Sequence, residues 1–347
     1  MNNAKTFWRK FAWLLVLIML FAVACGGDDD DDNDDNNDDN DVAGDDDDAI
    51  DDDDDDDDDD NNDDTGVDDD DDDDDDATPP PGCDTLQAGW NTGFTVDGVE
   101  RAFYLDLPQG VYDSWPWPVV FNWHGFGDTA TNMRTLFAPY INNSYMPYIL
   151  ITIEDSGMLF DWDLFDGLDP NNREVRLFDE LLAELDVCFG VDPERVYTTG
   201  FSVGSAIACL MGLVRNETVA AVAGCSGGYA SNPENTIPYA LTTWPDMSGE
   251  YNINRYVEVR LHGGVLDNMI LPFGLYGAND IGFLNENGHD AIDCVHSSLH
   301  NMGFMFMNPE NFIEFFYDHP LGTVDSPYAT EGLPDSFPDI CTFHPKQ

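Results

Sequence analysis

Ser202 lies at the centre of the pentapeptide GFSVG, between a strand-like run, 195–199, and a helix-like run, 206–214. A serine between a strand and a helix occupies a sharp turn, in which side chains two positions away would collide with the crossing backbone. Gly200 and Gly204 remove those side chains. The spacing therefore predicts an exposed serine nucleophile. The pentapeptide alone is a common pattern, so the prediction depends on the residues that follow it.

A serine hydroxyl becomes a good nucleophile when an imidazole takes its proton and a carboxylate orients that imidazole. Strand-like runs at 256–261 and 291–295 are followed by Asp267 and His300. Loops at the carboxyl ends of parallel strands meet at one edge of a sheet, so we expect Asp267 to be the acid and His300 the base. The chain order of serine, acid and histidine is that of α/β-hydrolases.

Two other histidines are alternatives for the base. His296 follows the same strand-like run as His300. His319 ends a helical pattern at 310–318, which predicts a position away from the site. The choice between His300, His296 and His319 stays open at this point.

The tetrahedral intermediate of acyl transfer needs two backbone N–H donors. One should be the amide of Val203, directly after the serine. The other should come from the glycine-rich turn HGFG after the strand-like run 119–123, where we expect the amide of Phe126. His124 and His262 precede glycines at strand ends and are expected to brace these loops by hydrogen bonds. No step requires a cofactor, and the cysteines lack the C-x-x-C spacing of a zinc site, so we expect no metal.

The pattern of the elements predicts how these loops are held. A hairpin with an Asp97-Gly98 turn is expected at 93–107, followed by short apolar runs typical of buried parallel strands. Those runs are 119–123, 149–153, 196–199, 219–223, 256–261 and 291–295, and helical patterns such as 173–187 separate them. This alternation predicts an α/β fold: a doubly wound, mostly parallel sheet of the α/β-hydrolase type with an N-terminal antiparallel hairpin, in one catalytic domain at 83–347.

Residues 1–25 combine a basic start, an apolar run and a small-residue end, as an export signal does. The sequence AVAC at its end resembles a bacterial lipobox, so we expect lipid on Cys25 and a place on the outer side of a bacterial membrane. The alternative is an ordinary secretory peptide. A membrane-spanning anchor is disfavoured because the apolar run is shorter than the ~20 residues of a span.

Residues 28–76 contain 35 Asp and neither Lys nor Arg. Such a segment cannot bury a core, so 26–82 is predicted to be a disordered linker that associates weakly with Ca²⁺ but lacks the pattern of a specific calcium loop. The whole chain carries a formal net charge of −59. The remaining domain is also acidic and has no basic patch, which argues against nucleic-acid binding.

Six cysteines remain besides Cys25, and an even number in an exported chain suggests disulfides. We interpret all six as structural, with the pairing open. They are Cys83, Cys188, Cys209, Cys225, Cys294 and Cys341.

Several segments together resemble secreted esterases related to poly(3-hydroxybutyrate) depolymerases, feruloyl esterases and acetylxylan esterases. They are VVFNWHG at 119–125, WD at 162–163, VDPERVYTTGFS at 191–202 and HG at 262–263 with Asp267. The resemblance implies a secreted serine carboxylic-ester hydrolase with Ser202, Asp267 and His300 as its triad. Ser205 and the sequence SLH ending at His300 depart from the glycines usual in the group, and the substrate is not inherited from the resemblance.

Four functions are therefore compared. The leading one is hydrolysis of an ester substrate, possibly polymeric, through an acyl-enzyme. The alternatives are a serine peptidase, an inactive hydrolase fold that acts as a surface binding module, and a calcium-sequestering Asp tract to which the domain is accessory.

Overall fold

The computed structural model describes residues 83, 85–112, 116–156, 162–164, 168–169, 171–231, 242–268 and 271–347. The predictions made for residues 1–82, namely the export signal, lipidation of Cys25 and the Asp-rich linker, lie outside the described residues. The predicted domain bounds stay a prediction. Among the described helices, none combines the length and hydropathy needed to span a bilayer.

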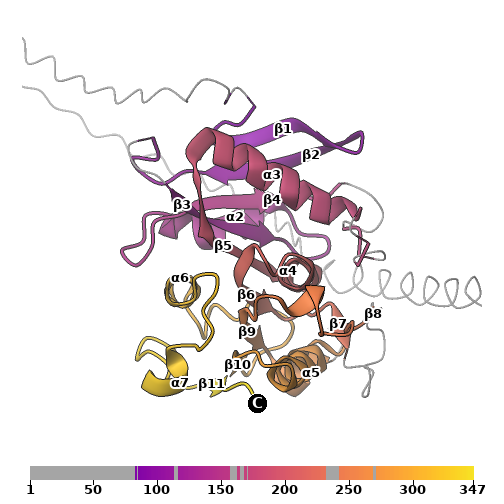
Figure 1. Ribbon diagram of the computed structural model, residues 1–347, viewed down its shortest axis with the longest axis vertical. Coiled ribbons are helices and arrows are strands. Elements are labelled where there is room, and N and C mark those ends of the chain that lie inside the picture. Colours follow the sequence, from indigo (N-terminus) through magenta and orange to yellow (C-terminus); the bar gives the residue numbers. More distant parts are fainter. Residues whose placement is uncertain are drawn as a thin grey trace, which may run out of the picture. The chain divides into compact units, whose positions relative to one another are not determined.

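A nine-stranded sheet runs through the described part of the chain in the order β1-β2-β4-β3-β5-β6-β9-β10-β11 (Figure 1). The six strands from β4 to β10 in this order pair in parallel, while β1, β2 and β11 join antiparallel. The bounds are β1 Gly89–Val96, β2 Val99–Asp106, β3 Trp117–Trp123, β4 Ile149–Ile153, β5 Val191–Phe201, β6 Val219–Cys225, β9 Val257–His262, β10 Ala291–Val295 and β11 Cys341–His344. A separate pair, β7 Ala230–Ser231 and β8 Thr242–Thr243, forms a second small sheet.

The central strands are buried along their whole length. Every residue of β4 and of β6 is buried, as expected for parallel strands that are covered on both faces. One apolar cluster joins the sheet to α3 and α4, and a second joins its other face to α2, α6 and α7. The helices are α2 Ala130–Phe137, α3 Arg173–Phe189, α4 Val203–Val214, α5 Phe273–Glu286, α6 Pro309–Asp318 and α7 Tyr328–Glu331, with 3₁₀ turns η1 Ala138–Tyr140, η2 Glu250–Asn252 and η3 Gly264–Asn268. The predicted doubly wound fold with an N-terminal hairpin is confirmed.

Local sequence explains where several elements begin. Asp97 and Gly98 both have positive φ, 52° and 75°, as the tight turn between β1 and β2 requires. Asn172 caps α3 by accepting hydrogen bonds from the amides of Glu174 and Val175. The Asp97-Gly98 turn was predicted from the sequence because its chemistry is local.

The cysteines form fewer disulfides than their even number suggested. Cys83 bonds to Cys188, and Cys294 bonds to Cys341 across the antiparallel pair β10–β11. Cys209 in α4 and Cys225 at the end of β6 are free and fully buried, and burial raises the pKa of both thiols. The even number suggested disulfides, and Cys209 and Cys225 form none; both pack as small apolar side chains in the core.

Candidate active site

Ser202 occupies a strained turn between β5 and α4. Its φ of 55° and ψ of −116° lie outside the regions that a serine ordinarily adopts. A Cβ added at Gly200 would lie 2.4 Å from the Gly204 carbonyl oxygen, and one added at Gly204 would lie 2.1 Å from the Trp123 carbonyl oxygen. The turn can form only because both flanking positions are glycine. The amide of Ser202 donates to the Cys225 carbonyl oxygen at 2.9 Å, which ties the turn to β6.

The structure brings Ser202, His300 and Asp267 into one hydrogen-bonded chain. His300 Nε2 lies 3.0 Å from Ser202 Oγ, and His300 Nδ1 lies 2.7 Å from Asp267 Oδ1. Nδ1–H donates to the carboxylate, so Nε2 is left to accept the serine proton. The loops after β9 and β10 supply the acid and the histidine, as the order of the strands predicted.

Asp267 and His300 are each held by further contacts. Asp267 is 1% exposed, and its Oδ2 accepts from the Gly263 amide at 3.3 Å. The His300 ring stacks on Phe273, with centroids 4.1 Å apart, and lies 4.9 Å from the ring of Phe201. The two aromatic rings restrict the imidazole to the plane in which both of its nitrogens meet their partners.

The alternative histidines have other partners. His296 Nδ1 accepts from the Ser298 amide at 3.2 Å, its ring stacks on Phe306, and burial lowers its pKa. His319 caps α6: its Nδ1 donates to the Phe315 carbonyl oxygen at 2.7 Å, and burial lowers its pKa to about 4. His300 is the histidine that contacts Ser202.

The turn at 124–127 borders the serine. A Cβ added at Gly125 would lie 3.4 Å from Ser202 Cβ and 2.9 Å from the ring of Phe201, so the backbone of Gly125 packs directly against the nucleophile turn. Phe126 follows on the same loop and is 36% exposed. Val203 begins α4, where the first amides of a helix have no partner within the helix.

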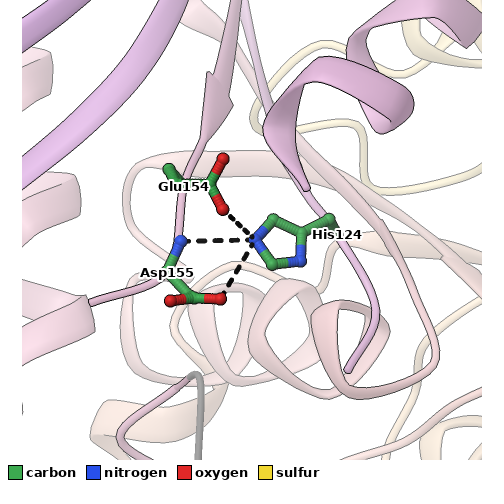
Figure 2. Close-up of side chains that lie close together, drawn as sticks. All are labelled: His124, Glu154 and Asp155. Carbon is green, nitrogen blue, oxygen red and sulfur yellow. Dashed lines mark hydrogen bonds and ion pairs between the residues drawn. The ribbon is translucent and has the colours of Figure 1, made fainter. Parts of the chain in front are cut away.

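The side chain of His124, the first residue of this turn, is fully buried and faces two carboxylates, as Figure 2 shows. Its Nδ1 donates to the Gly125 carbonyl oxygen at 2.8 Å, while Nε2 lies 3.3 Å from Glu154 Oε1, 3.8 Å from Asp155 Oδ2 and 3.2 Å from the Asp155 amide nitrogen. Burial acts to lower the pKa of His124, but hydrogen bonds to Glu154 and Gly125 and the two carboxylate charges outweigh it and raise that pKa. Burial acts to raise the pKa of Glu154, but the interaction with His124 and hydrogen bonds from backbone amides, Ala130 among them, outweigh it and lower that pKa.

The ligand atoms of His124, Glu154 and Asp155 fall within 4.8 Å of one another, a grouping with the chemistry to bind a cation. The lone pair of Nε2 is already engaged, by a proton shared with Glu154 or by the N–H of Asp155. The arrangement is therefore that of a hydrogen-bonded imidazole, as expected for a loop-bracing histidine. His262 has a similar role, since it accepts from the Gly264 amide at 3.0 Å and donates to Asp293 at 2.9 Å.

A buried charge cluster near the site was not predicted. Glu258 and Arg260 lie on β9, Asp280 lies on α5, and all three are at most 1% exposed. Arg260 forms ion pairs with both carboxylates, and Trp244 Nε1 donates to Asp280 at 3.1 Å. Burial raises the pKa of Asp280 to about 7, against the opposing charge of Arg260, and it also raises the pKa of Glu258. The sequence signal that could have indicated this cluster is the presence of Glu258 and Arg260 in an otherwise apolar strand.

This cluster contacts the backbone and side chains next to Ser202. Arg260 Nη1 donates to the Gly227 carbonyl oxygen at 2.7 Å and lies 3.4 Å from Ser205 Oγ. A Cβ added at Gly227 would lie 2.1 Å from the Ser202 carbonyl oxygen. Arg260 thus holds a glycine that packs directly beneath the serine.

The comparisons with known proteins agree with this fold. No family model matches the chain. Feruloyl esterase D of Neurospora crassa is 26% identical over 157 residues, which cover 42% of this chain and 54% of that relative, so the chain matches about half the length of that curated relative. The crystal structure of native pOPH superimposes with a TM-score of 0.58 at 16% identity, and the match covers 78% of this chain and 97% of the pOPH chain. Native sOPH gives a TM-score of 0.58 at 17% identity, and the match covers 77% of this chain and 96% of the sOPH chain. The chain has an α/β-hydrolase fold, and its sequence is similar to that of an esterase.

Proposed function

We propose that this protein is a serine carboxylic-ester hydrolase that acts through an acyl-enzyme. The observation that carries the proposal is the hydrogen-bonded chain from Ser202 Oγ through the imidazole of His300 to Asp267, with distances of 3.0 and 2.7 Å. His300 removes the serine proton as Ser202 attacks the ester carbonyl, and Asp267 stabilises the imidazolium that results. Water then attacks the acyl-enzyme with His300 again as the base.

The oxyanion of each tetrahedral intermediate is held by the amides of Val203 and Phe126. Support comes from Val203 at the start of α4 and from the contact of the Gly125 backbone with the serine turn. Two such donors stabilise the developing charge, and removing one typically costs about 10²–10³-fold in kcat. None of these steps calls for a metal or an organic cofactor.

The residues that flank the triad in sequence favour an ester with an apolar acyl group. Val265 and Leu266 precede Asp267, and Leu299 precedes His300, and these side chains are exposed to 85%, 44% and 54%. Exposed apolar side chains close to a catalytic group are a typical means of holding an apolar substrate. The name of the curated relative, Feruloyl esterase D, supports a substrate of this kind. We propose aromatic or aliphatic acyl esters, including polymeric ones.

Hydrolysis of p-nitrophenyl butyrate by the full chain tests this proposal. Turnover should fall at least 10⁴-fold in Ser202→Ala and comparably in His300→Ala, because the members of a triad act as a unit. A fluorophosphonate probe should label the wild type and not Ser202→Ala. Equal activity of the wild type and Ser202→Ala would refute the assignment, and cleavage of peptide anilides in preference to esters would favour a peptidase.

We also propose that the protein is exported and attached to the outer side of a bacterial membrane through lipid on Cys25. The two disulfides support export, because such bonds persist in oxidising compartments. Mass spectrometry of the mature N-terminus would detect the lipid, and Cys25→Ser should release the protein into the medium. A soluble wild type with an unmodified terminus would refute the anchor. Weak Ca²⁺ association with the Asp-rich tract is part of the same proposal.

A further inference from the structure

We propose that His124 is a positioning residue for the oxyanion site: by holding the carbonyl of Gly125, it aims the amide of Phe126 at the substrate oxygen. The inference rests on the proposed function. It assigns a role in the reaction to a side chain that lies beneath the loop.

The argument begins with the peptide unit that joins Gly125 to Phe126. Its C=O and N–H belong to one plane and point in opposite directions, because the peptide bond is planar and trans. His124 Nδ1 donates to the carbonyl oxygen at 2.8 Å, and the Asp128 amide donates to the same oxygen at 3.2 Å. With its carbonyl turned toward the His124 ring, the unit directs the N–H of Phe126 to the opposite side.

The serine turn borders the same loop. The Gly125 backbone faces it so closely that an added Cβ would lie 3.4 Å from Ser202 Cβ. A donor at Phe126 that points away from His124 is therefore available to an oxyanion formed on a carbonyl that Ser202 attacks. If the Gly125 carbonyl rotated, the N–H of Phe126 would turn with it and the donor would be lost.

His124 is itself held by several contacts, and Figure 2 shows those that Nε2 makes with Glu154 and Asp155. Glu154 and the backbone amide of Asp155 contact Nε2 at 3.3 and 3.2 Å. Glu154 Oε2 accepts from the amide of Ala130 at the start of α2 at 3.0 Å, and Trp162 Nε1 donates to the His124 carbonyl oxygen at 3.2 Å. Nδ1 carries a proton in the imidazolium and in the neutral form that accepts from Asp155, so the hold on the Gly125 carbonyl persists in both charge states.

A positioning role predicts an effect that a purely structural role would not produce. The contact between Phe126 N–H and the oxygen strengthens as negative charge develops, so misaiming the donor lowers kcat and leaves KM nearly unchanged. Because removing an oxyanion donor costs 10²–10³-fold, we expect a misaimed one to cost about 10–100-fold in kcat. An inhibitor that forms a tetrahedral adduct on Ser202, such as an alkyl boronic acid, should lose affinity by a similar factor.

The test compares three substitutions in the full chain. His124→Leu removes the donor, whereas His124→Asn keeps an N–H near the position of Nδ1 and should recover most of the lost kcat. The matched control is His289→Leu, because His289 is equally buried and its Nδ1 donates to the Tyr256 carbonyl oxygen at the same 2.8 Å. Rates for p-nitrophenyl butyrate are divided by the fraction of molecules that the fluorophosphonate probe labels, which removes losses from misfolding.

A 10–100-fold lower kcat in His124→Leu, with KM and the His289→Leu control unchanged, supports the proposal. If His124→Leu does not fold, Glu154→Gln takes its place, and it should lower kcat by a smaller factor at constant KM. An unchanged kcat per labelled site, or a loss confined to KM, overturns the proposal. Failure of the proposed function would be seen separately, as an absence of Ser202-dependent turnover in the wild type.

Discussion

Replacement of Arg260 by methionine tests how the buried charge cluster contributes to stability. Arg260 is 1% exposed and forms ion pairs with Glu258 and Asp280, which are both 0% exposed. Methionine fills a similar space without the charge, so two carboxylates would remain in an apolar interior with no cation. Breaking a buried pair in this way costs about 3–5 kcal/mol, because the remaining charge is uncompensated.

The cost should depend on pH with a defined sign. The pKa of Asp280 is raised by burial from 3.8 to about 7, so folding favours its protonated form. The contribution of Asp280 to the free energy of unfolding is therefore fully present below about pH 4 and is lost as the pH rises through about 7. Without Arg260 both carboxylates need protons to stay buried. We therefore expect Arg260→Met to cost about 3–5 kcal/mol at pH 8 and clearly less at pH 5.

Urea unfolding followed by tryptophan fluorescence, with the disulfides intact, measures both values. The control is Arg215→Met, because Arg215 pairs with Asp179 at the surface, with side-chain exposures of 24% and 42%. An exposed pair contributes about 0–1 kcal/mol, so this variant should lose little at either pH. A loss in Arg260→Met as small as that of the control at pH 8, or the same loss at pH 5 and pH 8, would refute the reasoning.

The other predictions concern a close backbone contact and a disulfide. Gly227→Ala should lower kcat at least tenfold, because its Cβ would lie 2.1 Å from the carbonyl oxygen of Ser202; Gly282→Ala, with no atom within 4 Å, should stay active, and equal activity of the two variants would contradict this. Replacing Cys83 and Cys188 by serine opens a crosslink across 105 residues, which should lower the free energy of unfolding by about 2–5 kcal/mol. Thermal melts of the wild type and this variant, with and without reductant, measure the loss, and unchanged melting would refute it.

The sequence predicted those parts of the fold that local patterns determine. The structure of β4 and β6, which are mainly apolar, and of the Asp97-Gly98 turn is determined by a few adjacent residues. The contact of Ser202 with His300 could be anticipated because both follow strands that end at one edge of a parallel sheet. That rule cannot decide between His300 and His296, because both follow the same strand. Packing decides it, since the ring of His296 is stacked on Phe306.

Elements whose stability depends on distant partners were missed. β11, Cys341–His344, is a short edge strand of half-buried and exposed residues, and it pairs with β10 about 47 residues earlier through a disulfide as well as a ladder. Nothing within its four residues indicates a strand. Cys209 and Cys225 stay unpaired because their places on α4 and β6 are set by the packing of the sheet, and the number of cysteines carries no information about that packing.

The buried charges of β9 also depend on a partner that is distant in the sequence. The run that forms β9 was predicted to be a buried strand, and it is buried throughout, with Glu258 and Arg260 included. What the strand itself does not show is the partner of this charge, because Asp280 on α5 supplies the further carboxylate that pairs with Arg260.

Arg101 on β2 repeats this arrangement with Glu174 on α3 at 2.8 Å, and both side chains are fully buried. A buried ion pair is weak evidence for stability, since apolar residues of similar volume often do as well. Both arginines, however, also donate to backbone carbonyls at the edge of the site: Arg101 to Glu154 at 3.3 Å and Arg260 to Gly227 at 2.7 Å. An apolar replacement could fill the space but could not donate to those carbonyls. The two arginines therefore place the loops around Ser202 through these hydrogen bonds. An Arg101→Met or Arg260→Met variant that still folds should hydrolyse p-nitrophenyl butyrate more slowly than the wild type.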